Sequence, residues 1–158
     1  MLDDDALYRG VFKLAIDRSF FGIQEDRLDS ELSSPAWLEL EIDEVPVRVA
    51  RGAVRIVSLV GTHRPLVAIE IRKKRPETPS GFKQIGRGCY LTYSGKATLY
   101  TLDGPHGSFS LAPNSEYEFI VWRKGQEAAP ERHDDLLGRV YPIEGLEEYL
   151  IQFIEQWI

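Results

Sequence analysis

Apolar and polar residues alternate with a period of two through most of this chain, and that alternation is the strongest constraint on its fold. It is clearest at residues 37–43, WLELEID, where apolar side chains occupy one parity and acidic side chains the other. Successive side chains of a β-strand point to opposite faces, so this pattern predicts half-buried strands. The further segments with strand patterning are 7–17, 45–49, 53–60, 66–72, 89–93, 96–102, 108–111 and 117–122.

Turn signals separate these short strands. Ser94-Gly95, between two strand segments, predicts a two-residue hairpin, and Asp103-Gly104 predicts another turn. Residues 20–22 are expected to lead into a polar loop, and the proline- and glycine-containing stretch 73–81 is also expected to be a loop. Many short strands with frequent turns predict a mainly β protein, either an antiparallel β-sandwich or an open barrel.

The C-terminal residues show a different period. Six apolar residues recur at helical spacing after Gly145, which predicts one C-terminal amphipathic helix over 146–158, packed on the sheet. With 158 residues we expect a single domain over 1–158, with a β-sandwich core at 7–123 and a polar connection at 124–145. The apolar residues of the predicted helix are Leu146, Tyr149, Leu150, Phe153, Ile154 and Trp157.

Charge is distributed unevenly along the chain, whose net charge is −6. Residues 25–44 hold eight acidic residues and one basic residue, whereas residues 45–96 hold eleven basic residues and two acidic ones. Such asymmetry often reports on partners, although folding can also bring the blocks together so that they screen each other. The segment 72–87, which begins RKKR, offers one alternative function as a nucleic-acid-binding module, with nearby aromatic residues to stack on bases.

No motif for catalysis or metal binding is evident, so we expect no enzyme activity, no catalytic residues, no metal and no cofactor. The serine hydrolase signature Gly-x-Ser-x-Gly is missing, and the glycine-rich run 81–88 precedes a predicted strand instead of the helix that a phosphate loop needs. The three histidines are far apart, and the one cysteine, Cys89, has no ligand pattern around it. The alternative is a small-ligand-binding β-barrel, or an enzyme with its site in the barrel mouth. The acidic N-terminal segment is unlike a signal peptide, so we expect a cytoplasmic protein.

Two stretches resemble the competence-protein-J family. Residues 107–122, GSFSLAPNSEYEFIVW, are similar to that family's Ser-Phe-x-Leu strand, short turn and Tyr-containing strand ending near a Trp. Residues 51–56 and the opening strand around Tyr8 are also similar, so the resemblance runs through 7–123 in order. Such proteins are cytoplasmic inhibitors of a DNA-degrading nuclease with a β-sandwich fold. Bacterial toxin-immunity proteins have the same general character.

The resemblance implies a non-enzymatic binding protein that inhibits a basic partner protein, namely a nuclease or toxin. Nucleases are basic where their substrate lies, so acidic side chains can imitate phosphates and speed the encounter. The acidic segment is therefore the expected contact surface. Its predicted partner-binding residues are Glu25, Asp26, Asp29, Glu31, Glu39, Glu41 and Asp43.

Overall fold

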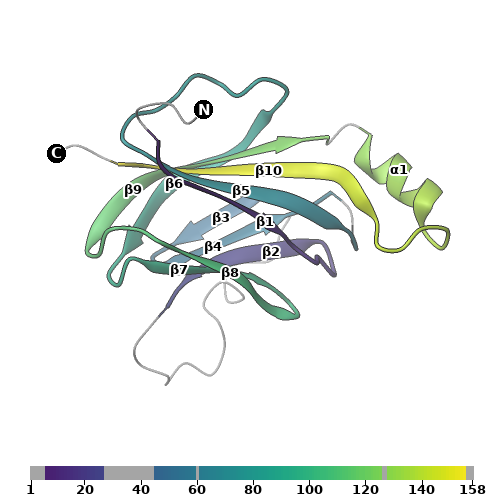
Figure 1. Cartoon of the computed structure of the whole chain (residues 1–158), viewed down its shortest axis with the longest axis horizontal. Helices are drawn as coiled ribbons and strands as arrows, with labels where there is room; N and C mark the ends of the chain where they lie inside the picture. Colours follow the sequence, from purple (N-terminus) through teal and green to yellow (C-terminus); the bar gives the residue numbers. More distant parts are fainter. Residues whose placement is uncertain (1–5, 27–44, 60, 126–127, 156–158) are drawn as a thin grey trace.

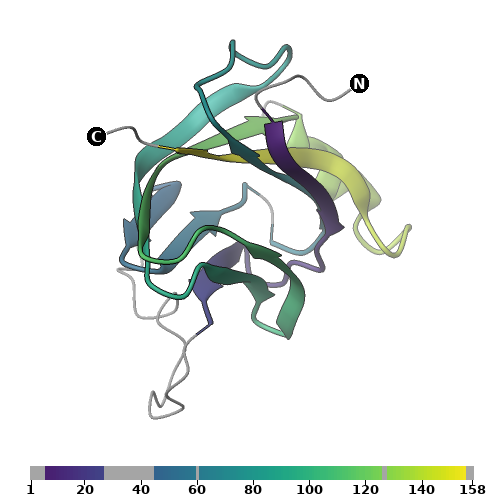
Figure 2. The ribbon, with the colours of Figure 1, turned by 60° about the vertical axis from the view of Figure 1, so that its left-hand side comes forward.

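The computed structural model describes residues 6–26, 45–59, 61–125 and 128–155, which form two five-stranded β-sheets packed face to face (Figure 1; Figure 2). The predicted mainly β, sandwich-like fold is confirmed, and in the described part of the chain the sheets do not close into a barrel. The elements in chain order are β1 (Ala6–Lys13), β2 (Phe20–Glu25), β3 (Val47–Ala50), β4 (Ala53–Val57), β5 (Arg64–Arg72), β6 (Lys83–Thr92), β7 (Lys96–Thr101), β8 (Gly104–Ser110), β9 (Ser115–Lys124), α1 (Ala129–Leu136) and β10 (Glu144–Glu155).

The strand order is β1-β5-β10-β9-β6 in the first sheet and β3-β4-β2-β7-β8 in the second. Every strand pair is antiparallel except β5 with β10, which is parallel. The predicted segment 37–43 lies outside the described residues. Residues 20–25 form strand β2, so the prediction that residues 20–22 lead directly into a loop was wrong.

The turn at Ser94-Gly95 is real, but the hairpin predicted there is wrong. β6 pairs with β9 in the first sheet, whereas β7 pairs with β2 and β8 in the second, so the turn carries the chain between the sheets. The Glu25 carboxylate explains this corner, because its Oε1 accepts hydrogen bonds from the backbone N–H groups of Tyr93 and Ser94, at 2.6 and 2.5 Å. The turn at Asp103-Gly104 does join a paired hairpin, β7 to β8.

The predicted C-terminal helix over 146–158 is wrong, because residues 144–155 form the twelve-residue strand β10. β10 lies between β5 and β9 and is buried on both faces. Tyr149, Ile151 and Phe153 face the core between the sheets, and Leu150 and Ile154 pack on the opposite face. A strand with two apolar faces has apolar residues at both parities, and over one short window their spacing coincides with that of a helix.

The helix instead lies within the segment 124–145. The prediction that this segment is only a polar connection was therefore also wrong. Helix α1 begins with Pro130 in its first turn, a position where the missing N–H of proline costs nothing. Its one buried residue, Ala129, joins Ile143 and Leu146 in a small separate cluster. Figure 1 shows α1 beyond the end of the sandwich, beside the start of β10.

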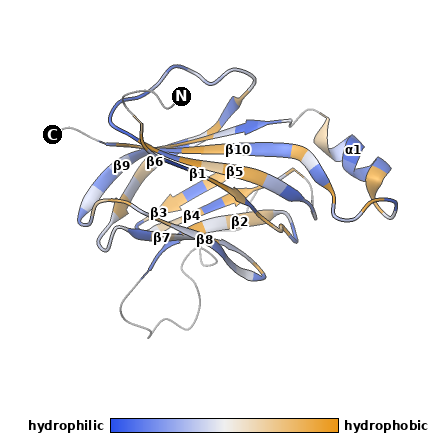
Figure 3. Cartoon of the chain, viewed as in Figure 1, coloured by the Kyte–Doolittle hydropathy of each residue, from blue (hydrophilic) through white to orange (hydrophobic). Residues whose placement is uncertain are grey.

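Aromatic side chains fill the space between the two sheets. Phe153, which is fully buried, lies at the centre, and its ring centroid is 5.2 to 6.2 Å from four other aromatic rings. These rings come from three strands of the two sheets, and each is at most 5% exposed. They belong to Tyr90, Phe109, Tyr117 and Phe119. Figure 3 shows hydrophobic residues recurring along the strands of both sheets.

Glycines let the two sheets approach each other along both seams of the sandwich. At the β1–β8 seam, a Cβ atom added to Gly107 would lie 2.3 Å from Cδ1 of Phe12. At the β3–β6 seam, a Cβ atom on Gly86 would lie 2.3 Å from Cγ2 of Val47. Real Cβ atoms do not come this close to a side chain, so both positions require glycine for space.

We expect Gly107→Ala and Gly86→Ala each to lower the free energy of unfolding by about 1–3 kcal/mol, the usual cost of overpacking. Gly61→Ala is the matched control, because its Cβ atom would meet nothing closer than Ser19 Oγ at 3.7 Å. Urea unfolding measures all three variants. In the double variant Phe12→Ala/Gly107→Ala the two changes should cost less than the sum of their separate costs, since shortening Phe12 removes the ring atoms that clash with the new Cβ atom. Equal midpoints for Gly86→Ala, Gly107→Ala and Gly61→Ala would show that the seams are not tightly packed.

Candidate functional site

The predicted partner-binding residue Glu25 is a structural residue. Its side chain is 3% exposed and accepts hydrogen bonds from Thr92 Oγ1 at 2.8 Å and from the N–H groups of the corner at residues 93–94. Burial opposes ionisation, but these hydrogen bonds outweigh it and hold the pKa of the Glu25 carboxyl below its ordinary value. A carboxylate enclosed in this way presents no oxygen to a partner, so its assignment to a contact surface was wrong.

The other predicted contact residues are only partly within the described structure. Asp26 is half-buried, and its Oδ1 accepts a hydrogen bond from Thr98 Oγ1 at 2.7 Å. The remaining five, Asp29, Glu31, Glu39, Glu41 and Asp43, lie outside the described residues.

Carboxylates of the first sheet neutralise part of the positive charge of the basic segment 72–87. Arg72 is 5% exposed and lies 3.7 Å from the Glu70 carboxylate. Arg75 and Arg87 both form ion pairs with Glu118 on β9. Part of the positive charge is therefore compensated locally, which weakens the interpretation of the segment as one continuous phosphate-binding surface. The exposed lysines of the segment are Lys73, Lys74 and Lys83.

A buried polar network lies at the end of the sandwich nearest α1. Ser58, just after β4, donates a hydrogen bond from its hydroxyl to Glu147 Oε1 at 2.6 Å, and its Oγ lies 2.8 Å from His63 Nε2. The other oxygen of Glu147 accepts a hydrogen bond from the Tyr149 hydroxyl at 2.8 Å and lies 3.5 Å from Arg123 Nε. The His63 and Glu147 side chains are both completely buried. The network thus joins β9, β10 and the β4–β5 connection.

This network does not have the geometry of a catalytic triad. In a triad the histidine stands between the serine and the acid and bonds each through a different ring nitrogen. Here Glu147 bonds Ser58 directly, and its nearest approach to His63 is 3.5 Å, to the same Nε2 that faces the serine. Because the Ser58 proton goes to Glu147, Nε2 must carry the proton shared with Ser58, and Nδ1 is left as an acceptor. No hydrogen-bond donor to Nδ1 is found among the described residues.

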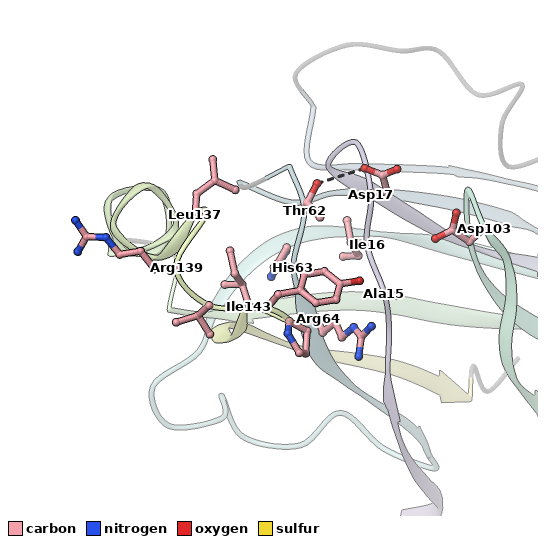
Figure 4. A pocket seen from close by; sticks show the side chains of 14 residues that line it. Ala15, Ile16, Asp17, Thr62, His63, Arg64, Asp103, Leu137, Arg139 and Ile143 are labelled. Carbon is pink, nitrogen blue, oxygen red and sulfur yellow. Dashed lines mark hydrogen bonds between the residues drawn. The ribbon is translucent and has the colours of Figure 1, made fainter.

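Beside this network lies a pocket of about 500 Å³, formed by the chain after β1, the start of β5, the β7–β8 turn and the segment after α1. Figure 4 shows Asp17 and Asp103 on one side of it and the residues following α1 on the other. His63 lines its inner wall. The polar and charged side chains of its lining are Asp17, Thr62, His63, Arg64, Asp103, Arg139 and Tyr141.

The segment 137–141, here called the tip, forms the outer wall of the pocket and carries exposed apolar side chains. Leu137, Val140 and Tyr141 are 61%, 48% and 84% exposed. The Arg64 guanidinium lies over the Tyr141 ring, 5.7 Å from its centroid. Large apolar side chains gathered on one projecting segment are typical of protein interaction sites, in which tyrosine is prominent.

The sequence analysis did not identify either the network or the pocket. Glu147 lay within the predicted C-terminal helix 146–158, and the tip lies within the segment 124–145, which was interpreted only as a polar connection. The available signal was the hydroxyl, imidazole and carboxylate set Ser58, His63 and Glu147, but the separation of 89 positions between Ser58 and Glu147 hides their proximity. Within the described residues, no three His, Cys, Asp or Glu side chains are placed to hold a metal ion, and no helix is long and apolar enough to cross a membrane.

Comparison with known structures defines the fold class. ComJ from Bacillus subtilis, an inhibitor of the DNA degrading activity of NucA, matches with a TM-score of 0.59 and 14% sequence identity, over 96% of this chain and 97% of ComJ. The crocagin biosynthetic gene J protein matches with a TM-score of 0.55 and 17% identity, over 96% of this chain and 100% of its own. The chain therefore has a ComJ-like fold, as the sequence resemblance predicted. No protein-family model and no curated protein matches its sequence.

The buried His63 predicts a pH dependence of stability. Burial, with a smaller contribution from nearby His133, lowers the pKa of His63 to about 4, from 6.5. Between these values the unfolded chain binds a proton at His63 and the folded chain does not, so acidification favours unfolding. We expect His63 to account for a loss of about 3 kcal/mol in unfolding free energy between pH 7 and pH 4.

Urea unfolding of the wild type and of His63→Gln, measured across this range, isolates that contribution because the variant cannot titrate at residue 63. The wild type should lose more stability than the variant as the pH falls. His106→Gln is the control, since His106 is only half-buried and bonds Thr101 at 3.1 Å. Parallel curves for the wild type and His63→Gln would show that the pKa of His63 is the same in the folded and unfolded protein, and so is not lowered by burial.

Proposed function

We propose that this protein is a cytoplasmic, non-enzymatic binding protein that inhibits a partner protein, and that the partner is a DNA-degrading nuclease. The observation that carries the proposal is the match to ComJ, which extends over nearly the whole of both chains. ComJ is an inhibitor of a nuclease, and the likeness in fold extends over 96% of this chain and 97% of ComJ. The buried Ser58, His63 and Glu147 set is consistent with this proposal, because it lacks the geometry of a catalytic triad.

The test is inhibition of a purified nuclease, and the first candidate is the DNA-degrading nuclease encoded beside this protein's gene, since inhibitors are often encoded next to their targets. We expect DNA degradation to stop at a stoichiometric amount of the inhibitor. Undiminished degradation in the presence of a tenfold excess would contradict the proposal. A small molecule or metal ion that copurifies tightly with the protein would instead support the carrier or enzyme alternative, which the pocket of about 500 Å³ favours.

We further propose that the acidic segment speeds association with the nuclease. Glu39, Glu41 and Asp43 carry this proposal on their sequence pattern alone, and Asp26, Asp29 and Glu31 add to the same charge. Changing Glu39, Glu41 and Asp43 to their amides should slow association roughly tenfold at low salt. The difference should shrink as the Debye length falls from ~10 Å at 0.1 M salt to ~3 Å at 1 M salt. Stopped-flow association rates measure both effects.

The exposed lysines provide the matched comparison. Replacing Lys73, Lys74 and Lys83 with glutamine should leave association with the nuclease within about twofold of the wild type, because they do not face a basic partner. The same two variants are then tested for DNA binding. Tight DNA binding by the wild type that only the lysine variant loses would overturn the inhibitor proposal in favour of a nucleic-acid-binding module.

A further inference from the structure

We propose that the pocket and the tip form the surface that holds the partner protein, and that the pocket receives a lysine or arginine side chain of that partner. This inference rests on the proposed function and adds the place and the chemistry of the contact. The acidic segment then governs the rate of encounter, while the pocket and tip govern how long the complex lasts.

The charges at the pocket favour a cation. Asp17 accepts only a 3.3 Å hydrogen bond from Thr62 Oγ1, and neither Asp17 nor Asp103 lies within ion-pair distance of a cation in the described part of the chain. Figure 4 shows both carboxylates on the same side of the pocket. Two carboxylates without a cationic partner in the described residues create a negative potential that a basic side chain would relieve.

The two arginines of the lining do not cancel this potential. Arg64 lies over the ring of Tyr141 at the outer wall, 5.7 Å from its centroid. Arg139 belongs to the tip, and Figure 4 shows its side chain directed away from the other labelled residues. The mouth therefore has two carboxylates against one nearby guanidinium. The inner wall adds no positive charge, because burial keeps the pKa of His63 near 4 and its Nδ1 carries a lone pair.

Size and surroundings favour a side chain presented by a protein. About 500 Å³ is within the range of ligand-binding clefts, so a long basic side chain can enter it. The adjoining wall is apolar and exposed, with Tyr141 at 84% and Leu137 at 61%. A partner that fills the pocket also covers these side chains, which gives the arrangement of an anchor surrounded by apolar contact that is typical of protein interfaces.

The pocket is also held in a fixed shape before binding. The β4–β5 connection at its inner wall is fastened by the hydrogen bond between Ser58 and Glu147 and by the bond from His133 Nε2 on α1 to the Thr62 carbonyl, at 3.0 Å. Arg64 N–H donates to the Ile143 carbonyl at 2.8 Å, which ties the start of β5 to the chain just after the tip. A preformed pocket loses little conformational entropy on binding.

Two variants test the surface in the nuclease-binding assay. Asp17→Asn/Asp103→Asn removes the carboxylates, and Tyr141→Ser removes the most exposed apolar side chain of the tip. Each should weaken binding by about tenfold or more, mainly through faster dissociation. The matched controls are Glu77→Gln/Glu116→Gln, which removes the same charge from exposed positions elsewhere, and Tyr93→Ser, at a tyrosine 57% exposed. The controls should stay within about twofold of the wild type.

A probe that needs no nuclease keeps the inference separate from the proposed function. N-acetyl-arginine methylamide, titrated into the full-length protein, should shift the NMR signals of His63, Asp103 and Tyr141, and Asp17→Asn/Asp103→Asn should abolish those shifts. The corresponding norleucine derivative should produce none. If the nuclease is not inhibited but the arginine probe binds, the proposed function fails and the pocket chemistry stands. If the wild type inhibits the nuclease and the pocket and tip variants bind it within twofold of the wild type, or if the probe causes no shifts, the inference is overturned.

Discussion

The burial of strand β10 on both faces is the constraint on which the rest of this structure depends. On one face of β10, Phe153 lies at the centre of the aromatic core. On the other face, Leu150 packs with Ile120 and Trp122 on the outside of the first sheet. Because β10 pairs with β5 on one side and β9 on the other, its position fixes the middle of that sheet. A polar residue on its outer face, Gln152, is accommodated by hydrogen bonds from Trp122 Nε1 at 2.8 Å and to Glu70 at 3.0 Å.

The same strand connects the core to the pocket. Glu147, near its beginning, is buried and satisfied by Ser58 and Tyr149, with Arg123 close by. A buried carboxylate is costly unless its hydrogen bonds are made, so these partners are held firmly. Their positions in turn fix the β4–β5 connection, which forms the inner wall of the pocket. The serine, histidine and glutamate of this network are residue types that catalytic sites use. Here they support the inner wall of the adjacent pocket.

Charge in this protein is organised by the fold and not by position along the chain. Arg72 and Arg75 belong to one basic run, yet they are compensated by Glu70 and Glu118 on different strands. Glu25 belongs to the acidic segment by sequence but serves as a buried acceptor at the corner between β6 and β7. In contrast, Asp17 and Asp103, which are distant in sequence and stand in no charge cluster, lie together at the mouth of the pocket. Among the described residues, the blocks of charge in the sequence therefore give little indication of the charged surfaces.

The sequence by itself determined the class of fold and most of its strands. The period-two patterns and turn residues act locally, and β4, β5 and β7 lie where that patterning indicated. Tertiary structure alone decided that residues 144–155 are a strand, because its hydrogen bonds are made by β5 and β9 and its inward face is covered by the second sheet, contacts that no short window of sequence contains. It also decided that the Ser94-Gly95 turn joins two sheets, through a carboxylate about seventy residues away. The pocket was likewise invisible in the sequence, because its walls come from four separate segments that only the packing of the two sheets brings together.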